Sequence, residues 1–229
     1  MKKWTLLEQV STPDGSNLSL AEHDGTYAIR VNGRELMSSR HSFSEEQLGV
    51  VACQPLRPVK GARVLIGGLG LGFTLRAALS TLARDAHVVV AELLPEIVTW
   101  NRNPAYPLSS AALADPRTQI VIGDVASVIE QSLACFDAIM LDADNQTTSM
   151  NTAGNTRLYQ AAGLAAVHRA LTNGGRAVYW SAGEEPAFVD RFGKSGFDVE
   201  VRRVRRHPAA KASHFLLIGR RVALSQGRS

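Results

Sequence analysis

The chain has 229 residues, of which 45% are hydrophobic and 20% charged, and its net charge is +4. This length suits one α/β domain with a small addition and leaves little room for two full domains. No apolar run reaches the length of a membrane span, and the N-terminus turns polar too early for a signal peptide. We therefore expect a globular cytoplasmic protein that has no membrane partner.

Residues 1–40 predict a small N-terminal β-meander. Short stretches that alternate between apolar and polar residues are separated by the turn signals "PDG", "HDG" and "NG". The next stretch, "SSRHSFSEEQLGVVACQPL", predicts a helix with Ser42 or Ser44 as its N-cap, Glu45 and Glu46 in its first turn and a stop near Pro55. A meander of this size buries little core by itself, so we expect it to pack on the main domain or on another subunit.

Residues 41–222 predict the main domain, and residues 223–229 a flexible tail. From Ala62 onward, apolar strands alternate with helices. The predicted strands are "RVLIGG", "HVVVAE", "TQIVIGD", "FDAIMLD" and "RAVYWSA", and a long helix over "TRLYQAAGLAAVHRAL" ends at an "NGG" C-cap. Continuous apolar strands separated by helices are typical of a parallel sheet that is covered on both faces.

Two late strands, "FDVEVRRVRR" and "SHFLLIGRRV", are expected to pair antiparallel. The first begins a basic stretch, in which the positive charges belong to Arg202, Arg203, Arg205, Arg206 and Lys211. We predict that Val201 and Val204 point inward while the arginines lie in solvent. Nucleic acid is disfavoured as a partner because no aromatic side chains are interleaved with these charges.

The segment "VLIGGLGLGFTLRAAL" predicts a strand, a glycine-rich turn and a helix, an arrangement that brings backbone N–H groups close to a ligand. Its glycines at 68, 70 and 72 form GxGxG, whereas the dinucleotide fingerprint requires GxGxxG. No Gly-Lys-Ser or Gly-Lys-Thr follows, so a phosphate-binding P-loop is excluded. A tight turn without a ligand remains an alternative when the loop is considered alone.

Acidic residues end the strands that follow the loop. Glu92 ends the second strand, where a carboxylate can accept hydrogen bonds from both hydroxyls of a ribose. Asp124 ends the third strand, where it can recognise an adenine amine, and Asp142 ends the fourth, near the expected reacting centre. Each acid alone can also be a helix cap or a surface residue. Their occurrence at successive strand ends indicates a nucleoside site.

The sequence resembles the class I S-adenosylmethionine-dependent methyltransferase fold and, within it, the spermidine synthase (polyamine aminopropyltransferase) family. The segments that carry the resemblance are "IGGLGLG", "VVVAELLPEIV", "IGDV", "FDAIMLDAD", "RLYQ" and "AGEEPAF". The resemblance implies a Rossmann-like, mostly parallel seven-stranded sheet with an antiparallel late strand, a homodimer, and S-adenosylmethionine or its decarboxylated form as co-substrate.

The same resemblance assigns roles to individual residues. Gly68, Gly70, Gly72 and Glu92 would hold the ribose and amino-acid side of the nucleoside, and Asp124 would meet the adenine. Asp142 would be the catalytic residue that orients an attacking amine and accepts its proton. The substrate-binding candidates are Glu184, Asp144 and Tyr159.

The chain departs from the family in three places. The segment "FSEEQLGVVACQPL" lacks the Tyr and the His or Gln that line the diamine channel in the family. Leu69 and Leu71 stand in the glycine loop where an aspartate is usual, and Asn145 stands where a second aspartate is expected. The six histidines are scattered without metal-ligand spacing, so no metal is expected.

Three functions therefore remain open. The first is a spermidine synthase-like transferase that alkylates a small amine, for example by aminopropyl transfer. The second is an S-adenosylmethionine-dependent methyltransferase on the same scaffold. The third is a non-catalytic nucleoside-binding homologue that has lost the diamine site.

Overall fold

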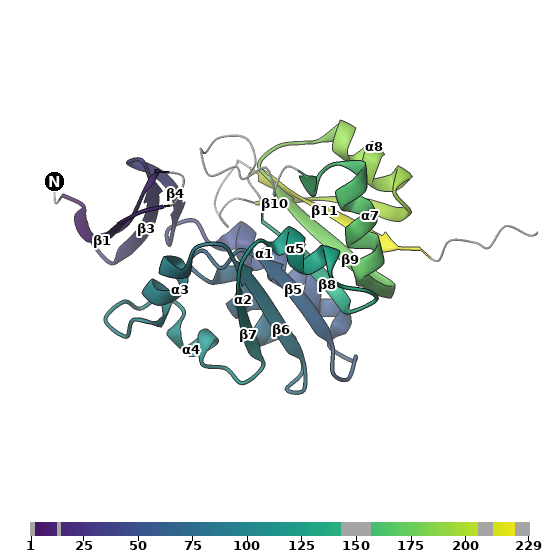
Figure 1. The fold of residues 1–229 in the computed structure, drawn as a ribbon, viewed down its shortest axis with the longest axis horizontal. Coiled ribbons are helices and arrows are strands. Elements are labelled where there is room, and N and C mark those ends of the chain that lie inside the picture. Colours follow the sequence, from purple (N-terminus) through teal and green to yellow (C-terminus); the bar gives the residue numbers. More distant parts are fainter. Residues whose placement is uncertain (1–2, 13–14, 143–156, 206–212, 223–229) are drawn as a thin grey trace, which may run out of the picture.

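Two β-sheets follow each other along the chain in the computed structural model, which describes residues 3–12, 15–142, 157–205 and 213–222 (Figure 1). The first sheet contains β1 (Thr5–Ser11), β2 (Asn17–His23), β3 (Thr26–Val31) and β4 (Arg34–Ser38), paired antiparallel in chain order. Asn32 and Gly33 both have positive φ, 51° and 78°, as a two-residue hairpin turn requires. The predicted N-terminal β-region is confirmed.

The second sheet has seven strands in the order β10-β11-β9-β8-β5-β6-β7. Their bounds are β5 (Arg63–Gly67), β6 (His87–Glu92), β7 (Thr118–Ile122), β8 (Phe136–Leu141), β9 (Leu171–Ser181), β10 (Phe197–Arg205) and β11 (Ser213–Arg221). Strands β5 to β9 are parallel, and β11 pairs antiparallel with both β9 and β10. The chain reverses its direction of travel across the sheet between β7 and β8, so the carboxyl ends of β5 and β8 border a topological switch point. The expected α/β Rossmann-like fold is confirmed.

Helices cover both faces of this sheet (Figure 1). Their bounds are α1 (Phe43–Cys53), α2 (Phe73–Thr81), α3 (Pro95–Arg102), α4 (Ser110–Leu113), α5 (Val125–Glu130), α7 (Ala161–Ala170) and α8 (Pro186–Lys194). Alternate strand residues enter different cores: Val64 and Ile66 pack with α1, α2 and α3, whereas Leu65 packs with α5, α7 and α8. Among the described residues, none of the helices combines the length and the apolar character that a membrane crossing needs.

The predicted "NGG" helix cap is wrong. Helix α7 ends at Ala170, and Leu171 already has extended φ and ψ of −75° and 148°. The glycines belong to β9, where the register with β8 shifts between Phe136 and Ala138 and Gly174 has a φ of +75°. A glycine with positive φ suits an irregularity in a strand as well as a helix end, so the local sequence does not separate the two.

The prediction that Val201 and Val204 both point inward is also half wrong. Val204 is 7% exposed, whereas Val201 is 44% exposed. Successive side chains of a strand point to opposite faces, so residues three apart cannot share one face. Only Val204 lies in the core beside α1.

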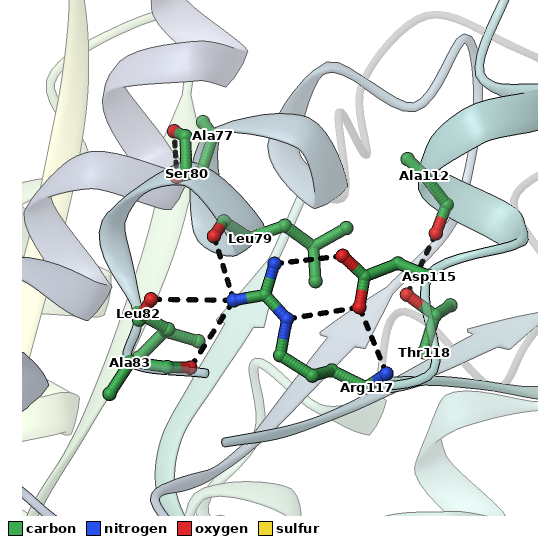
Figure 2. A network of polar contacts seen from close by, with 9 residues as sticks. All are labelled: Ala77, Leu79, Ser80, Leu82, Ala83, Ala112, Asp115, Arg117 and Thr118. Atoms are coloured by element: carbon green, nitrogen blue, oxygen red, sulfur yellow. Dashed lines mark hydrogen bonds and ion pairs between the residues drawn. The ribbon is translucent and has the colours of Figure 1, made fainter. Parts of the chain in front are cut away.

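A polar network at the amino end of the sheet closes the C-terminal end of α2 (Figure 2). The Arg117 guanidinium donates to the carbonyl oxygens of Leu79, Leu82 and Ala83 at 2.9, 3.3 and 3.2 Å, while Asp115 accepts two further bonds from it at 2.9 and 2.8 Å. These carbonyls belong to the negative end of a helix, where a cation is stabilising. This network belongs to the scaffold and lies at the opposite end of the parallel strands from the predicted site.

Candidate functional site

The glycine loop joins the carboxyl end of β5 to α2, and all three predicted glycines have left-handed backbone. Their φ values are +92° at Gly68, +53° at Gly70 and +75° at Gly72. A Cβ at Gly72 would lie 2.1 Å from the Ser109 Oγ, whereas a Cβ at Gly68 would meet no atom of the described residues within 4 Å. Gly68 thus leaves open space beside the loop, and Gly72 allows the loop to pack closely on the scaffold.

Glu92 joins this loop to the end of β6. Its Oε2 accepts a hydrogen bond from the backbone N–H of Leu69 at 2.7 Å, and its Oε1 accepts one from Leu94 at 2.9 Å. The side chain is 7% exposed. Burial raises the pKa of Glu92, and the backbone hydrogen bonds oppose that rise. The result is a buried carboxyl group held at the base of the loop, where each oxygen retains further accepting capacity.

Three side chains from outside the loop fix its carbonyl groups. Asn101 of α3 donates from Nδ2 to the Gly70 carbonyl at 2.8 Å, and Ser109 donates from Oγ to the Leu71 carbonyl at 2.8 Å. Arg76 also donates to the Leu71 carbonyl, at 3.2 Å. Two of these contacts, from Asn101 and Ser109, span more than thirty residues of sequence, and loop spacing alone does not reveal them.

The N-terminal sheet also reaches the loop. Leu71 donates its backbone N–H to the Met37 Sδ at 3.0 Å, and a Cβ at Gly70 would lie 2.6 Å from the same sulfur. The Leu69 and Leu71 side chains are 5% and 1% exposed and belong to the core beside α1 and α2. These leucines therefore anchor the loop in the core.

Asp124 follows β7 and caps α5. Its Oδ1 accepts from the Ala126 N–H at 2.9 Å, and its Oδ2 accepts from Arg157 at 3.1 Å. The Arg157 side chain also lies 3.5 Å from Glu130. Asp124 can cap the helix and also contact a ligand, because only its Oδ1 caps α5. Its Oδ2 is paired with Arg157, whose side chain is partly exposed.

The candidates for the acceptor side occupy different surroundings. Asp142 directly follows β8 and is half-buried, whereas Glu184 is exposed between β9 and α8. The Tyr159 ring packs on Tyr179 and Phe188, with centroids 5.2 and 5.0 Å away. Asp144 lies outside the described residues. Topology thus brings Asp142 to the same sheet edge as the glycine loop and Glu92, while Tyr159 is in contact with the second core.

Sequence reasoning missed Met37 and Arg157. Neither residue belongs to a short motif, and each meets its partner across more than thirty positions of sequence. Within the described part of the chain, no group of three or more His, Cys, Asp or Glu side chains is placed to hold a metal ion.

The matches to this chain among known proteins are solved structures. No protein-family model and no curated protein sequence matches the chain. Two solved structures that match are spermidine synthase in complex with the transition state analogue AdoDATO and spermidine synthase from Thermotoga maritima. In each case the TM-score is 0.71 at 19% identity, over 94% of this chain and 72% of the other. The chain therefore has the fold of these spermidine synthases, a class I methyltransferase-like fold.

Proposed function

We propose that the chain is a spermidine synthase-like transferase that binds S-adenosylmethionine or its decarboxylated form and alkylates a small amine. The observation that carries the proposal is the hydrogen-bonded unit of glycine loop and Glu92 at the switch point of the sheet. A buried carboxyl group at the end of β6 suits the paired hydroxyls of a ribose. Among the described residues, backbone N–H groups and not cations donate hydrogen bonds to Glu92, which also suits this neutral ligand group.

The adenine end of the nucleoside fits the neighbouring strand end. Leu93 follows Glu92 in the sequence and is 42% exposed. Ile122 faces Glu92 in the pairing of β6 with β7 and is 51% exposed. Exposed aliphatic side chains beside a carboxylate suit a flat heterocycle that carries an amine. Asp124 supplies that carboxylate in this proposal, and Arg157 moves aside or contacts the base when the nucleoside binds.

The acceptor end of the site requires a carboxylate that works on an amine. An alkylamine is protonated at neutral pH and lacks the lone pair needed for attack. Asp142 is proposed to orient the amine and accept its proton, and Glu184 to bind a distal ammonium. The co-substrate supplies a carbon attached to positively charged sulfur, which is a good leaving group, so alignment is the main task of the protein.

Methyl transfer from S-adenosylmethionine is the second candidate function. Residues 67–73 contain no acidic residue, and the two leucines among them are buried. The loop itself therefore offers no carboxylate to the free ammonium of the decarboxylated co-substrate. A homodimer is part of the proposal under either chemistry.

Nucleoside binding is tested by calorimetric titration with methylthioadenosine, S-adenosylmethionine and decarboxylated S-adenosylmethionine. Gly68→Ala should lower the affinity at least about tenfold, because its new methyl group enters the open space beside the loop. Gly33→Ala is the matched control, since Gly33 has a φ of +78° and equally open surroundings in a turn of the N-terminal sheet. Both variants carry the same kind of backbone strain, but only the first should change binding.

The reaction is tested by turnover of decarboxylated S-adenosylmethionine with putrescine. Asp142→Asn should lower kcat about a hundredfold with little change in nucleoside affinity. Asp190→Asn, on the exposed side of α8, should leave kcat unchanged. Failure of all three nucleosides to bind contradicts the proposal. Binding without alkylation of any amine contradicts the transferase assignment, and methyl transfer alone selects the second candidate.

A further inference from the structure

Strand β10 is the outermost strand of the seven-stranded sheet, and it is long. It pairs with β11 over nine consecutive residues without a register shift, and no other strand in the described part of the chain lies on its outer side. An edge of this length presents a row of backbone donors and acceptors to any chain that can pair with it. Natural edges are usually short, bulged or protected by charge, so the charges on β10 need separate consideration.

The charges on β10 are arranged in a definite order. Even-numbered residues share the face of Val204, beside α1, and odd-numbered residues share the face of Phe197, beside α8. Glu200 and Arg202 therefore lie on one face, where Arg202 donates to Glu200 at 2.8 and 3.0 Å. Val201, between them, points to the other face and is 44% exposed.

Symmetry restricts how β10 can pair with a second copy of itself. Opposite residues in an antiparallel ladder alternate between hydrogen-bonded and non-hydrogen-bonded pairs. A two-fold axis makes the pairs on either side of it identical, so it must pass through a position where a residue faces its own copy. Each register is then defined by one central residue.

Only one central position matches the charges. About Val201, Glu200 faces Arg202 of the second copy twice, and the exposed valines face each other. With the axis at position 200 the two glutamates face each other, and with the axis at 202 the two arginines do. With the axis at 199 Asp198 faces Glu200 of the second copy, and with the axis at 203 the arginines at 203 meet. Val201 is also the midpoint of Phe197–Arg205, so this register pairs the full strand.

We propose that β10 is a homodimer interface, in which two copies pair antiparallel about Val201 and their sheets become continuous. Nine facing positions give about eight to ten backbone hydrogen bonds, which is typical of a stable interface. Glu200 and Arg202 of both copies form a square of alternating charges, and cross-strand pairs of opposite charge stabilise a sheet. This interface rests on the homodimer of the proposed function and specifies its surface, whereas the transferase chemistry is tested separately because the assembly requires no ligand.

The charge pairing is tested by sedimentation of three variants and one mixture. Glu200→Arg alone and Arg202→Glu alone each place like charges opposite one another, and each should raise the dimer dissociation constant about tenfold or more. The double variant Glu200→Arg/Arg202→Glu should dimerise like the wild type. An equimolar mixture of the two single variants should form heterodimers, because their charges are complementary only to each other.

The register is tested by Val201→Cys in a Cys135→Ser background, since Cys135 is a partly exposed thiol. Facing residues in a ladder have Cα atoms about 4.5 to 5.5 Å apart, within the range for a disulfide, so mild oxidation should link two copies. Val199→Cys is the matched control on the same face, and it should not link, because each copy faces position 203.

A wild type that stays monomeric at high micromolar concentration overturns both this interface and the homodimer of the proposed function. The interface alone is overturned if the wild type dimerises and both single variants dimerise equally well, or if Val199→Cys links as readily as Val201→Cys. An unchanged circular dichroism spectrum in the single variants will show that a lost dimer is not lost folding.

Discussion

Glu92 is the residue whose ionisation should set the pH dependence of nucleoside binding. Its carboxylate accepts best when ionised, and burial raises its pKa. Affinity for methylthioadenosine should therefore fall as the pH is lowered through that raised pKa, at a higher pH than an ordinary glutamate would give. Glu92→Gln should lower the affinity and flatten the profile, as measured by calorimetry between about pH 5 and 8.

The same ionisation has a stability effect of opposite sign. A carboxyl group whose pKa is higher in the folded state than in the unfolded state destabilises the fold at high pH, and this cost disappears as the group is protonated. Asp190→Asn is the control for both the affinity and the stability profiles, because the Asp190 side chain is exposed. An affinity profile that is the same in wild type and Glu92→Gln would refute the role of Glu92.

At the residue scale, the sequence predicted the site residues whose positions depend only on which strand they end. Glu92 and Asp142 stand at the ends of the second and fourth strands of the predicted parallel sheet, and the structure brings their positions to one edge. Arg157 was missed because its contact with Asp124 joins residues 33 positions apart in the sequence and depends on tertiary packing. Leu69 and Leu71 were interpreted as a missing carboxylate, whereas their burial shows that they also hold the loop in the core.

At the scale of elements, Arg117 should matter for stability and not for ligand binding. Arg117→Ala removes a cation from three carbonyls at the end of α2 and leaves Asp115 without its partner (Figure 2). We expect a loss of about 2 kcal/mol in the free energy of unfolding, measured with urea. Arg84→Ala, an exposed arginine just after the same helix, should cost much less.

The partner of Arg117 gives this prediction a pH dependence. The hydrogen bonds from Arg117 lower the pKa of Asp115, so their contribution is present above the pKa of an unfolded aspartate and is lost as pH falls through the lower folded value. The difference between wild type and Arg117→Ala should therefore shrink in acid. A change in methylthioadenosine affinity that exceeds the change in Arg84→Ala would contradict the assignment of Arg117 to the scaffold.

Helices and strands were predictable where the hydrophobic period was clear. The face to which each strand residue points was less predictable. The alternation of apolar strands and helices led directly to β5 through β9, because burial on both faces requires such strands. The strand β10 was predicted as well, but the orientation of Val201 was wrong. Pairing with β11 sets which residues of an edge strand face the helices, and a run of charged residues carries little of that information.

At the scale of the whole molecule, the N-terminal sheet and the main domain share one core. Leu20 and Ile29 of the small sheet belong to the same buried cluster as Leu71 and Leu75 of the loop and α2. Tyr106 donates from its hydroxyl to Glu8 of β1 at 2.8 Å, which adds a polar link between the two parts. We expect the two sheets to unfold together because each leaves part of that core exposed without the other.

Met37 should transmit ligand binding from the glycine loop to β4. A nucleoside that holds the loop also holds the Leu71 N–H against the Met37 sulfur, so opening of β4 should become rarer. Amide hydrogen exchange should therefore slow in residues 34–38 as well as 68–72 when methylthioadenosine is added. Met37→Ala should abolish the slowing in β4, whereas Leu36→Ala, its exposed neighbour, should retain it. Slowing confined to the main domain of the wild type would mean that the small sheet does not respond to the site.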